Sequence, residues 1–170
     1  MTINQDGGRK LTKLALALVA ASSASAASAG WQATQWNMTP EEVAGAMTGK
    51  APLSKGSGGD RLGGKRIANV GEYAGDAARF RTVYYYDADG LAHVALKKKS
   101  GKCEDIYRSL VVLHGQPLRV SDQLILKLVI WHDRPARNRI RLLVSKSICD
   151  LNYERLEDYE AVDLAAAKRS

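Results

Sequence analysis

The sequence predicts an α+β fold in which an antiparallel sheet carries two helices on one of its faces. The segment 40–49 begins with the residues of a helix cap, and the segment 103–115 has apolar residues at helical spacing. Each is followed by segments in which apolar and polar residues alternate. Short connections between the alternating segments indicate that successive strands pair antiparallel. The same order of elements also fits a duplicated α-β-β-β unit.

The first 29 residues have the three parts of a secretory signal peptide. A basic region with Arg9, Lys10 and Lys13 precedes an apolar stretch that is shorter than the roughly 20 residues needed to span a bilayer. Small residues follow and end in Ala-Ser-Ala at Ala29. We therefore expect cleavage after Ala29, and a single domain, residues 30–170, that is periplasmic or secreted and has no transmembrane segment.

The charge of the chain favours acidic partners. The sequence contains 25 Lys and Arg against 18 Asp and Glu, a net charge of +7. Loss of the signal peptide, with three basic residues and one acidic residue, leaves +5. This excess favours anionic lipid headgroups, cell-wall polymers or acidic proteins. Nucleic acid is not an expected partner outside the cytoplasm.

The two cysteines lie in the exported part of the chain. Cys103 falls on the apolar stripe of the predicted helix 103–115, and Cys149 falls on the apolar face of a predicted strand, 147–155. An even number of cysteines in an oxidising compartment predicts a disulfide. Two buried thiols are the alternative. Both positions point toward one core if the helix covers the sheet, which favours a Cys103–Cys149 bond.

The start of the first helix carries complete capping chemistry. Thr39 is suited to the N-cap and Pro40 to the first helical position. Glu42 stands three residues after the cap and completes a capping box, while Met38 and Val43 occupy the positions of a hydrophobic staple. We therefore expect a helix that begins directly after Thr39.

The remaining elements follow from alternation and turn residues. The Gly/Ser/Lys-rich segment 49–65 is expected to be a flexible loop. The chain from residue 157 onward is expected to form a loose C-terminal helix. Strands are expected at 66–73, 77–87, 91–98, 124–132, 139–146 and 147–155.

The segment 36–43, Trp-Asn-Met-Thr-Pro-Glu-Glu-Val, resembles a Trp-Gly-Met-Thr-x-x-x-Val signature of small, largely uncharacterised exported bacterial proteins. More distantly, it resembles the outer-membrane assembly lipoproteins called SmpA or BamE and the β-lactamase-inhibitor-like fold. The resemblance implies a role in protein binding. Asn37 stands in place of the glycine, and the lipid-anchor cysteine of the lipoproteins is absent. Further resemblance lies in Arg79-Phe80, Asp89-Gly90-Leu91, Cys103, Gly115-Gln116-Pro117 and Cys149-Asp150-Leu151-Asn152-Tyr153.

Two patterns resemble catalytic sites but are better explained by turns and loops. Residues 59–65 nearly spell a phosphate-binding loop, but Arg66 stands where a hydroxyl side chain would bind magnesium. Asp87 and Asp89 form a carboxylate pair of the kind that glycosidases use. They flank a hairpin turn, where aspartates are common.

The histidines do not predict a metal site. No two of His93, His114 and His132 have the spacing of metal ligands. His132 and Asp133 at a strand end suggest an acid–base pair, although a turn explains them as well. We therefore expect no metal or cofactor and assign no catalytic residue.

Basic residues indicate a candidate binding surface. Arg139 and Arg141 alternate along one predicted strand, and Lys127 and Trp131 are expected on the outward face of its neighbour. A basic face with an exposed tryptophan suits an anionic surface or an acidic partner. A solvated sheet face explains the same residues. A separate basic run, Lys97–Lys99 with Lys102, ends another strand.

These observations favour a non-enzymatic exported protein that binds an envelope protein or an anionic envelope component. Two alternatives stay open, namely a periplasmic hydrolase with an unrecognised site and a small-ligand carrier. The carrier would use a tyrosine-lined strand face with Tyr84 and Tyr86.

Overall fold

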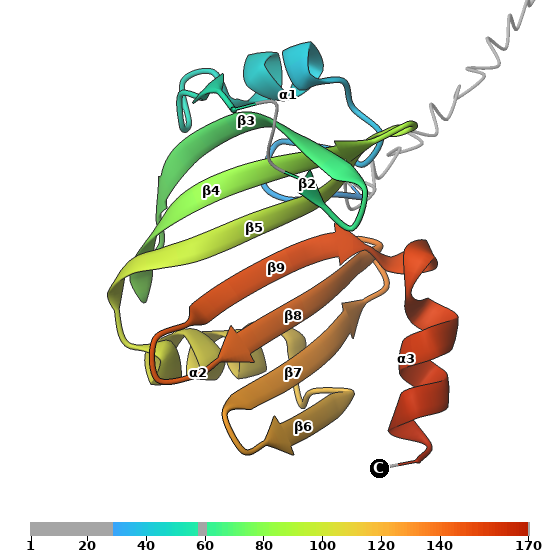
Figure 1. The fold of residues 1–170 in the computed structure, drawn as a ribbon. Coiled ribbons are helices and arrows are strands. Elements are labelled where there is room, and N and C mark those ends of the chain that lie inside the picture. Colours follow the sequence, from blue (N-terminus) through green and yellow to red (C-terminus); the bar gives the residue numbers. More distant parts are fainter. Residues whose placement is uncertain (1–28, 58–60, 170) are drawn as a thin grey trace, which may run out of the picture.

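The computed structural model describes residues 29–57 and 61–169. Within these residues, nine strands form one antiparallel sheet accompanied by three short α-helices (Figure 1). The predicted signal peptide lies outside the described residues apart from Ala29. No helix in the described ranges is long and apolar enough to cross a membrane.

The elements follow one another in an order that alternates short helices with groups of strands. In chain order they are α1 (Pro40–Met47), β1 (Ser54–Lys55), β2 (Arg61–Leu62), β3 (Lys65–Ala74), β4 (Ala78–Asp87), β5 (Gly90–Gly101), α2 (Cys103–His114), β6 (Arg119–Gln123), β7 (Leu126–Asp133), β8 (Asn138–Val144), β9 (Cys149–Arg155), a 3-10 turn (Leu156–Asp158) and α3 (Glu160–Ala167).

The last strand occupies the middle of the sheet. The strand order is β1-β3-β4-β5-β9-β8-β7-β6, with β2 paired to β3 off this path. Because β9 lies between β5 and β8, it joins the meander β3–β5 to the meander β6–β8 (Figure 1). The sheet is therefore continuous only through this C-terminal strand.

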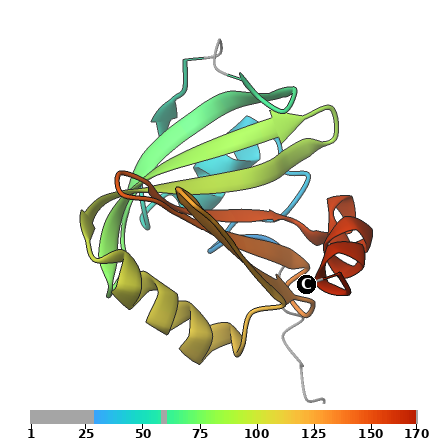
Figure 2. The ribbon, with the colours of Figure 1, turned by 60° about the horizontal axis from the view of Figure 1, so that its bottom comes forward.

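The predicted α+β fold with two helices on one face is wrong. Strands dominate the described residues, and the helices contact both faces of the sheet. Helices α1 and α2 bury apolar side chains in the main core, whereas Asp163 of α3 binds a side chain on the opposite face. Figure 2 shows α2 and α3 well separated around the strands. An extra strand, β6, and a third helix also depart from a repeated α-β-β-β unit.

The main core lies between the sheet and the helices α1 and α2. Val43 and Met47 of α1 and Ile106 and Leu110 of α2 pack into it. The sheet contributes alternate residues of β4, as the alternation predicts, together with residues of the other long strands. Among the largest buried side chains are Tyr84, Tyr86, Leu96, Trp131, Ile140 and Leu142.

The segment 49–65 is more ordered than its glycine content suggests. It contains β1 and β2, and both pair with β3. The amide of Gly56 donates to the Ala68 carbonyl at 2.6 Å, and a Cβ at Gly56 would lie 2.5 Å from Ile67. This glycine therefore permits close approach to β3. Residues 58–60, two of which begin the phosphate-loop look-alike 59–65, lie outside the described residues.

The predicted cap of α1 is confirmed. The Thr39 hydroxyl accepts a hydrogen bond from the Glu42 amide at 3.3 Å, and the Glu42 carboxylate accepts one from the Thr39 amide at 2.8 Å. Asn37 has a φ of +69°, in the left-handed region that favours glycine. Its amide donates to the Leu91 carbonyl, which fixes the entry to α1 against β5.

The predicted disulfide is present. Cys103 at the start of α2 is bonded to Cys149 at the start of β9, with a Cα–Cα distance of 5.9 Å. The bond fastens α2 to the strand that joins the two halves of the sheet. A disulfide is typical of proteins outside the cytoplasm.

We predict that removing this bond destabilises the domain without changing its fold. The two cysteines are 46 residues apart, and a crosslink over this separation stabilises by about 4 kcal/mol in the chain-entropy model. Urea unfolding of the Cys103→Ala/Cys149→Ala variant should show a loss of this size, and dithiothreitol should lower the stability of the wild type only. Equal stability of variant and wild type, or free thiols detected by mass spectrometry of the non-reduced protein, would contradict the prediction.

Candidate functional site

The four residues of the predicted basic face do not lie on one surface. In the register of β7 and β8, Trp131 pairs with Ile140 and Lys127 with Val144, so both side chains point to the face covered by α2. Trp131 is only 1% exposed, and its indole N–H donates to the Gly115 carbonyl at 3.0 Å. The expected exposed tryptophan is therefore a core residue.

The error arose because both faces of β7 are covered. Val129 and Trp131 enter the main core, yet Ile130 on the other face is also fully buried. Alternation identifies the inward face only when one face meets solvent. Lys127 differs from Trp131 in that its ammonium stays near the surface, 5.7 Å from the centre of the Tyr107 ring.

Arg139 and Arg141 lie on the opposite face and are held by carboxylates. Arg139 Nε and Nη2 donate to the two oxygens of Asp163 at 2.6 and 2.9 Å, and Nη1 donates to Glu154 at 2.5 Å. Arg141 Nη2 donates to the other oxygen of Glu154 at 2.8 Å. The bidentate geometry with Asp163 is the strong form of this ion pair. These positive charges are therefore matched within the protein.

The ion-pair network of Arg139, Glu154 and Asp163 also includes His132, and it attaches α3 to the sheet. His132 Nε2 lies 3.0 Å from Asp163 Oδ2, and the Arg139 guanidinium stacks 4.6 Å from the centre of the Tyr159 ring. Burial by itself raises the pKa of Asp163, but hydrogen bonds from Arg139 and His132 outweigh it and lower the pKa. Asp163 is therefore a charged anchor that ties α3 to β7 and β8.

The other two histidines also have structural surroundings. Burial lowers the pKa of His93 to about 4, and its Nε2 lies 2.9 Å from Asn152 Oδ1. Burial lowers the pKa of His114 as well, and its Nδ1 lies 3.7 Å from Asp133. Among the described residues, no group of three or more His, Cys, Asp or Glu side chains is arranged to hold a metal ion.

The two most exposed large aliphatic side chains of the described residues, Leu124 and Ile125, lie together in a hairpin turn and share a groove with a third exposed one, Ile148, from the neighbouring hairpin. Leu124 is fully exposed and Ile125 is 85% exposed in the turn between β6 and β7, and Ile148 is 44% exposed in the turn between β8 and β9. All three line one groove of about 730 Å³ with Lys127 and Lys146. We call Leu124, Ile125 and Ile148 the apolar tip.

Lysines surround the apolar tip. Lys127 and Lys146 line its groove, and a second depression of about 340 Å³ connects Ile148 and Lys146 to Lys98 and Lys102. The acidic side chains that line these two hollows are Asp122 and Glu104. Four ammonium groups against two carboxylates leave this end of the molecule positive.

Sequence reasoning missed the tip because it placed Leu124 and Ile125 in a strand. The strand β7 begins only at Leu126, and the two preceding residues form the turn. A signal was present in the sequence, because three adjacent aliphatic residues, Leu124 to Leu126, interrupt the alternation at the start of the expected strand. The lysine run at the end of β5, in contrast, was visible in the sequence and contributes Lys98 to this surface.

The tyrosines expected to line a ligand face are core residues. The side chains of Tyr84 and Tyr86 are buried, so the strand face proposed for a carrier is not accessible. Burial raises the pKa of Tyr84 to about 12. Both tyrosines are therefore part of the main core.

Comparison with known proteins gives one distant structural neighbour. No protein-family model matches the chain, and no curated protein matches it. A solved structure, that of a DUF4309 family protein (YjgB) from Bacillus subtilis subsp. subtilis str. 168, is similar with a TM-score of 0.42 and 10% sequence identity. The match covers 74% of this chain and 83% of that one.

We predict that the Arg139–Asp163 pair contributes to stability and not to binding. The variant Asp163→Asn removes one of the two carboxylates that bind the buried Arg139 guanidinium, and it should lose about 3 kcal/mol in urea unfolding at pH 7. Because the pKa of Asp163 is lowered in the folded state, the difference from wild type should persist down to about pH 4 and shrink below it.

The matched control is Glu160→Gln, which removes a carboxylate that pairs with Arg134 on the exposed side of the same helix at 2.7 Å. Exposed ion pairs contribute less than about 1 kcal/mol. Equal losses in the two variants would contradict a special role for Asp163.

Proposed function

We propose that this protein is an exported, non-enzymatic domain that binds the anionic membrane surfaces of the cell envelope through its apolar tip. The observation that carries this proposal is the pair Leu124 and Ile125, two adjacent aliphatic side chains at a hairpin turn that no other part of the described chain covers. The lysines around the tip give it the charge that complements anionic lipids.

The composition of the tip suits the boundary between headgroups and acyl chains. Burying an aliphatic side chain of this size in an apolar phase contributes about 2 kcal/mol. Each lysine near an anionic membrane adds about 1 kcal/mol. Lysine also keeps its ammonium at headgroup level while its aliphatic stem lies along apolar surface. Three aliphatic residues and four lysines therefore combine two attractions at one end of the molecule.

The surroundings of the tip favour a membrane over a globular partner. The core of a protein interface is depleted of lysine, whereas lysines line the same hollows as the apolar tip. The Cys103–Cys149 bond supports a location outside the cytoplasm, where such membranes face an oxidising compartment. The arginines of the opposite face make no comparable contribution because Glu154 and Asp163 neutralise them.

We predict that the exported protein co-sediments with vesicles rich in phosphatidylglycerol and not with vesicles of phosphatidylcholine alone. The variant Leu124→Ser/Ile125→Ser should lower vesicle binding at least tenfold, because it removes about 3–4 kcal/mol of apolar burial. The variant Lys98→Glu/Lys146→Glu should lower it as well, and added salt should weaken the wild type.

The matched control is Val112→Ser/Val162→Ser, which removes two aliphatic residues that are 84% and 68% exposed on α2 and α3, away from the apolar tip. It should bind vesicles as the wild type does. Unchanged binding by the tip variant, or loss of binding by the control to the same extent, would overturn the proposal. Binding to an acidic envelope protein without any vesicle binding would overturn it too.

A further inference from the structure

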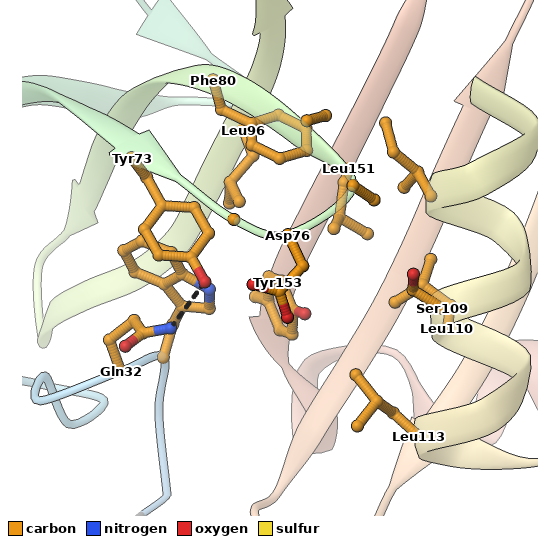
Figure 3. Close-up of a pocket in the computed structure, with 15 residues that line it drawn as sticks. Gln32, Tyr73, Asp76, Phe80, Leu96, Ser109, Leu110, Leu113, Leu151 and Tyr153 are labelled. Carbon is orange, nitrogen blue, oxygen red and sulfur yellow. Dashed lines mark hydrogen bonds between the residues drawn. The ribbon is translucent and has the colours of Figure 1, made fainter. Parts of the chain in front are cut away.

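A cavity of about 220 Å³ lies between α2 and the sheet face that carries the main core (Figure 3). Helix α2 contributes one wall with Ile106, Leu110 and Leu113, and the sheet contributes Leu96 and Leu151. The turn between β3 and β4 and the lead-in to α1 complete the lining. The cavity is separate from the apolar tip, with which it shares no lining residue.

Four aromatic rings form a continuous wall on one side of this cavity. Tyr73 and Trp31 pack edge to face with centroids 5.2 Å apart, and Phe80 stacks on Tyr73 at 6.3 Å. Tyr153 lies 6.3 Å from Trp31 on the other side. All four rings line the same small space, and this suits a cation because the π-face of an aromatic ring is negative.

The polar groups of the cavity are few and convergent. Asp76 is its only charged lining residue, and this carboxylate makes no ion pair with any other described residue. Figure 3 shows Asp76 extending from the β3–β4 turn toward the cavity. Burial raises the pKa of Tyr153, which keeps its hydroxyl protonated. Ser109 adds a second hydroxyl from α2, and Gln32 donates to the Tyr73 hydroxyl at 3.4 Å.

We propose that this cavity binds a small organic cation with an apolar body, of the quaternary alkylammonium class. The aromatic wall receives the positive charge, Asp76 balances it, and the leucines and Ile106 receive the alkyl part. Although the chain has a net charge of +7, the only charged side chain that lines this cavity is the carboxylate of Asp76. The cavity therefore attracts cations and repels anions. The proposal does not depend on membrane binding by the apolar tip.

The test compares choline with its neutral isostere, 3,3-dimethylbutan-1-ol, in which carbon replaces the ammonium nitrogen. Both are titrated into the exported protein and followed by the indole N–H signals in NMR spectra, with the Trp31 signal assigned from Trp31→Phe. Choline should shift the Trp31 signal and bind at least about fivefold more tightly than the isostere. Equal affinities, tighter binding of the neutral alcohol, or no binding of choline at 50 mM would overturn the proposal.

Substitution of Asp76 tests the contribution of its negative charge to choline binding. Asp76→Asn should reduce the preference for choline, because only the aromatic wall then favours the cation, whereas Asp89→Asn, which alters an exposed aspartate in the β4–β5 turn, should leave the preference unchanged. Both positions are exposed, so neither change threatens folding. A preference that Asp76→Asn does not reduce would overturn the role of this carboxylate.

In a cell envelope, a quaternary ammonium group can belong to a free solute or to a lipid headgroup. A further arm therefore adds phosphatidylcholine vesicles and follows the same Trp31 signal. A shift with free choline alone supports the cavity as a solute site. Shifts with both support it as a site that also accepts the headgroup, and a shift with neither overturns it.

Discussion

The pairing of β9 between β5 and β8 is the interaction on which the rest of this structure depends. Without it, the two meanders of the sheet have no shared hydrogen bonds. Cys149 at its start holds α2, Glu154 on one face binds both Arg139 and Arg141, and Tyr153 on the other lines the cavity. Arg155 at its end reaches Asn37, Asp87 and Asp158, so it links the entry to α1, the β4–β5 hairpin and the C-terminal turn.

The cationic side chains of the protein divide into two groups with different physical roles. Arg139, Arg141 and Arg155 are buried or half-buried and bound by carboxylates, and a planar guanidinium is suited to such multiple hydrogen bonds. The lysines around the apolar tip are bound by no comparable network and leave their charge available. Net charge alone does not distinguish these groups, because it counts a neutralised arginine and a displayed lysine equally.

The sequence predicted correctly those structural features that depend on residues close together in the chain. The capping box of α1 needs only Thr39 and Glu42. The disulfide prediction used the apolar faces of one helix and one strand, and it also required that this helix cover the sheet. The surface of β7 was not predictable in this way. Trp131 and Ile130 are both buried although they point to opposite sides. Helix α2 packs on the face of Trp131, and the opposite face carries the network that joins Asp163 of α3 to His132 and Arg139. Alternation contains no information about which distant element covers a face.

The sequence by itself determined the helix start at Thr39, the alternation of β4 and the positions of the two cysteines, because these depend on contacts or periodicities within a few residues. Only the tertiary structure decided that β9 lies at the centre of the sheet, that Arg139 meets Asp163 of α3, and that Leu124 and Ile125 stay uncovered. Those outcomes depend on pairing between segments far apart in the chain. Many registers and packings satisfy the same local pattern, and the free energy of the whole fold selects among them.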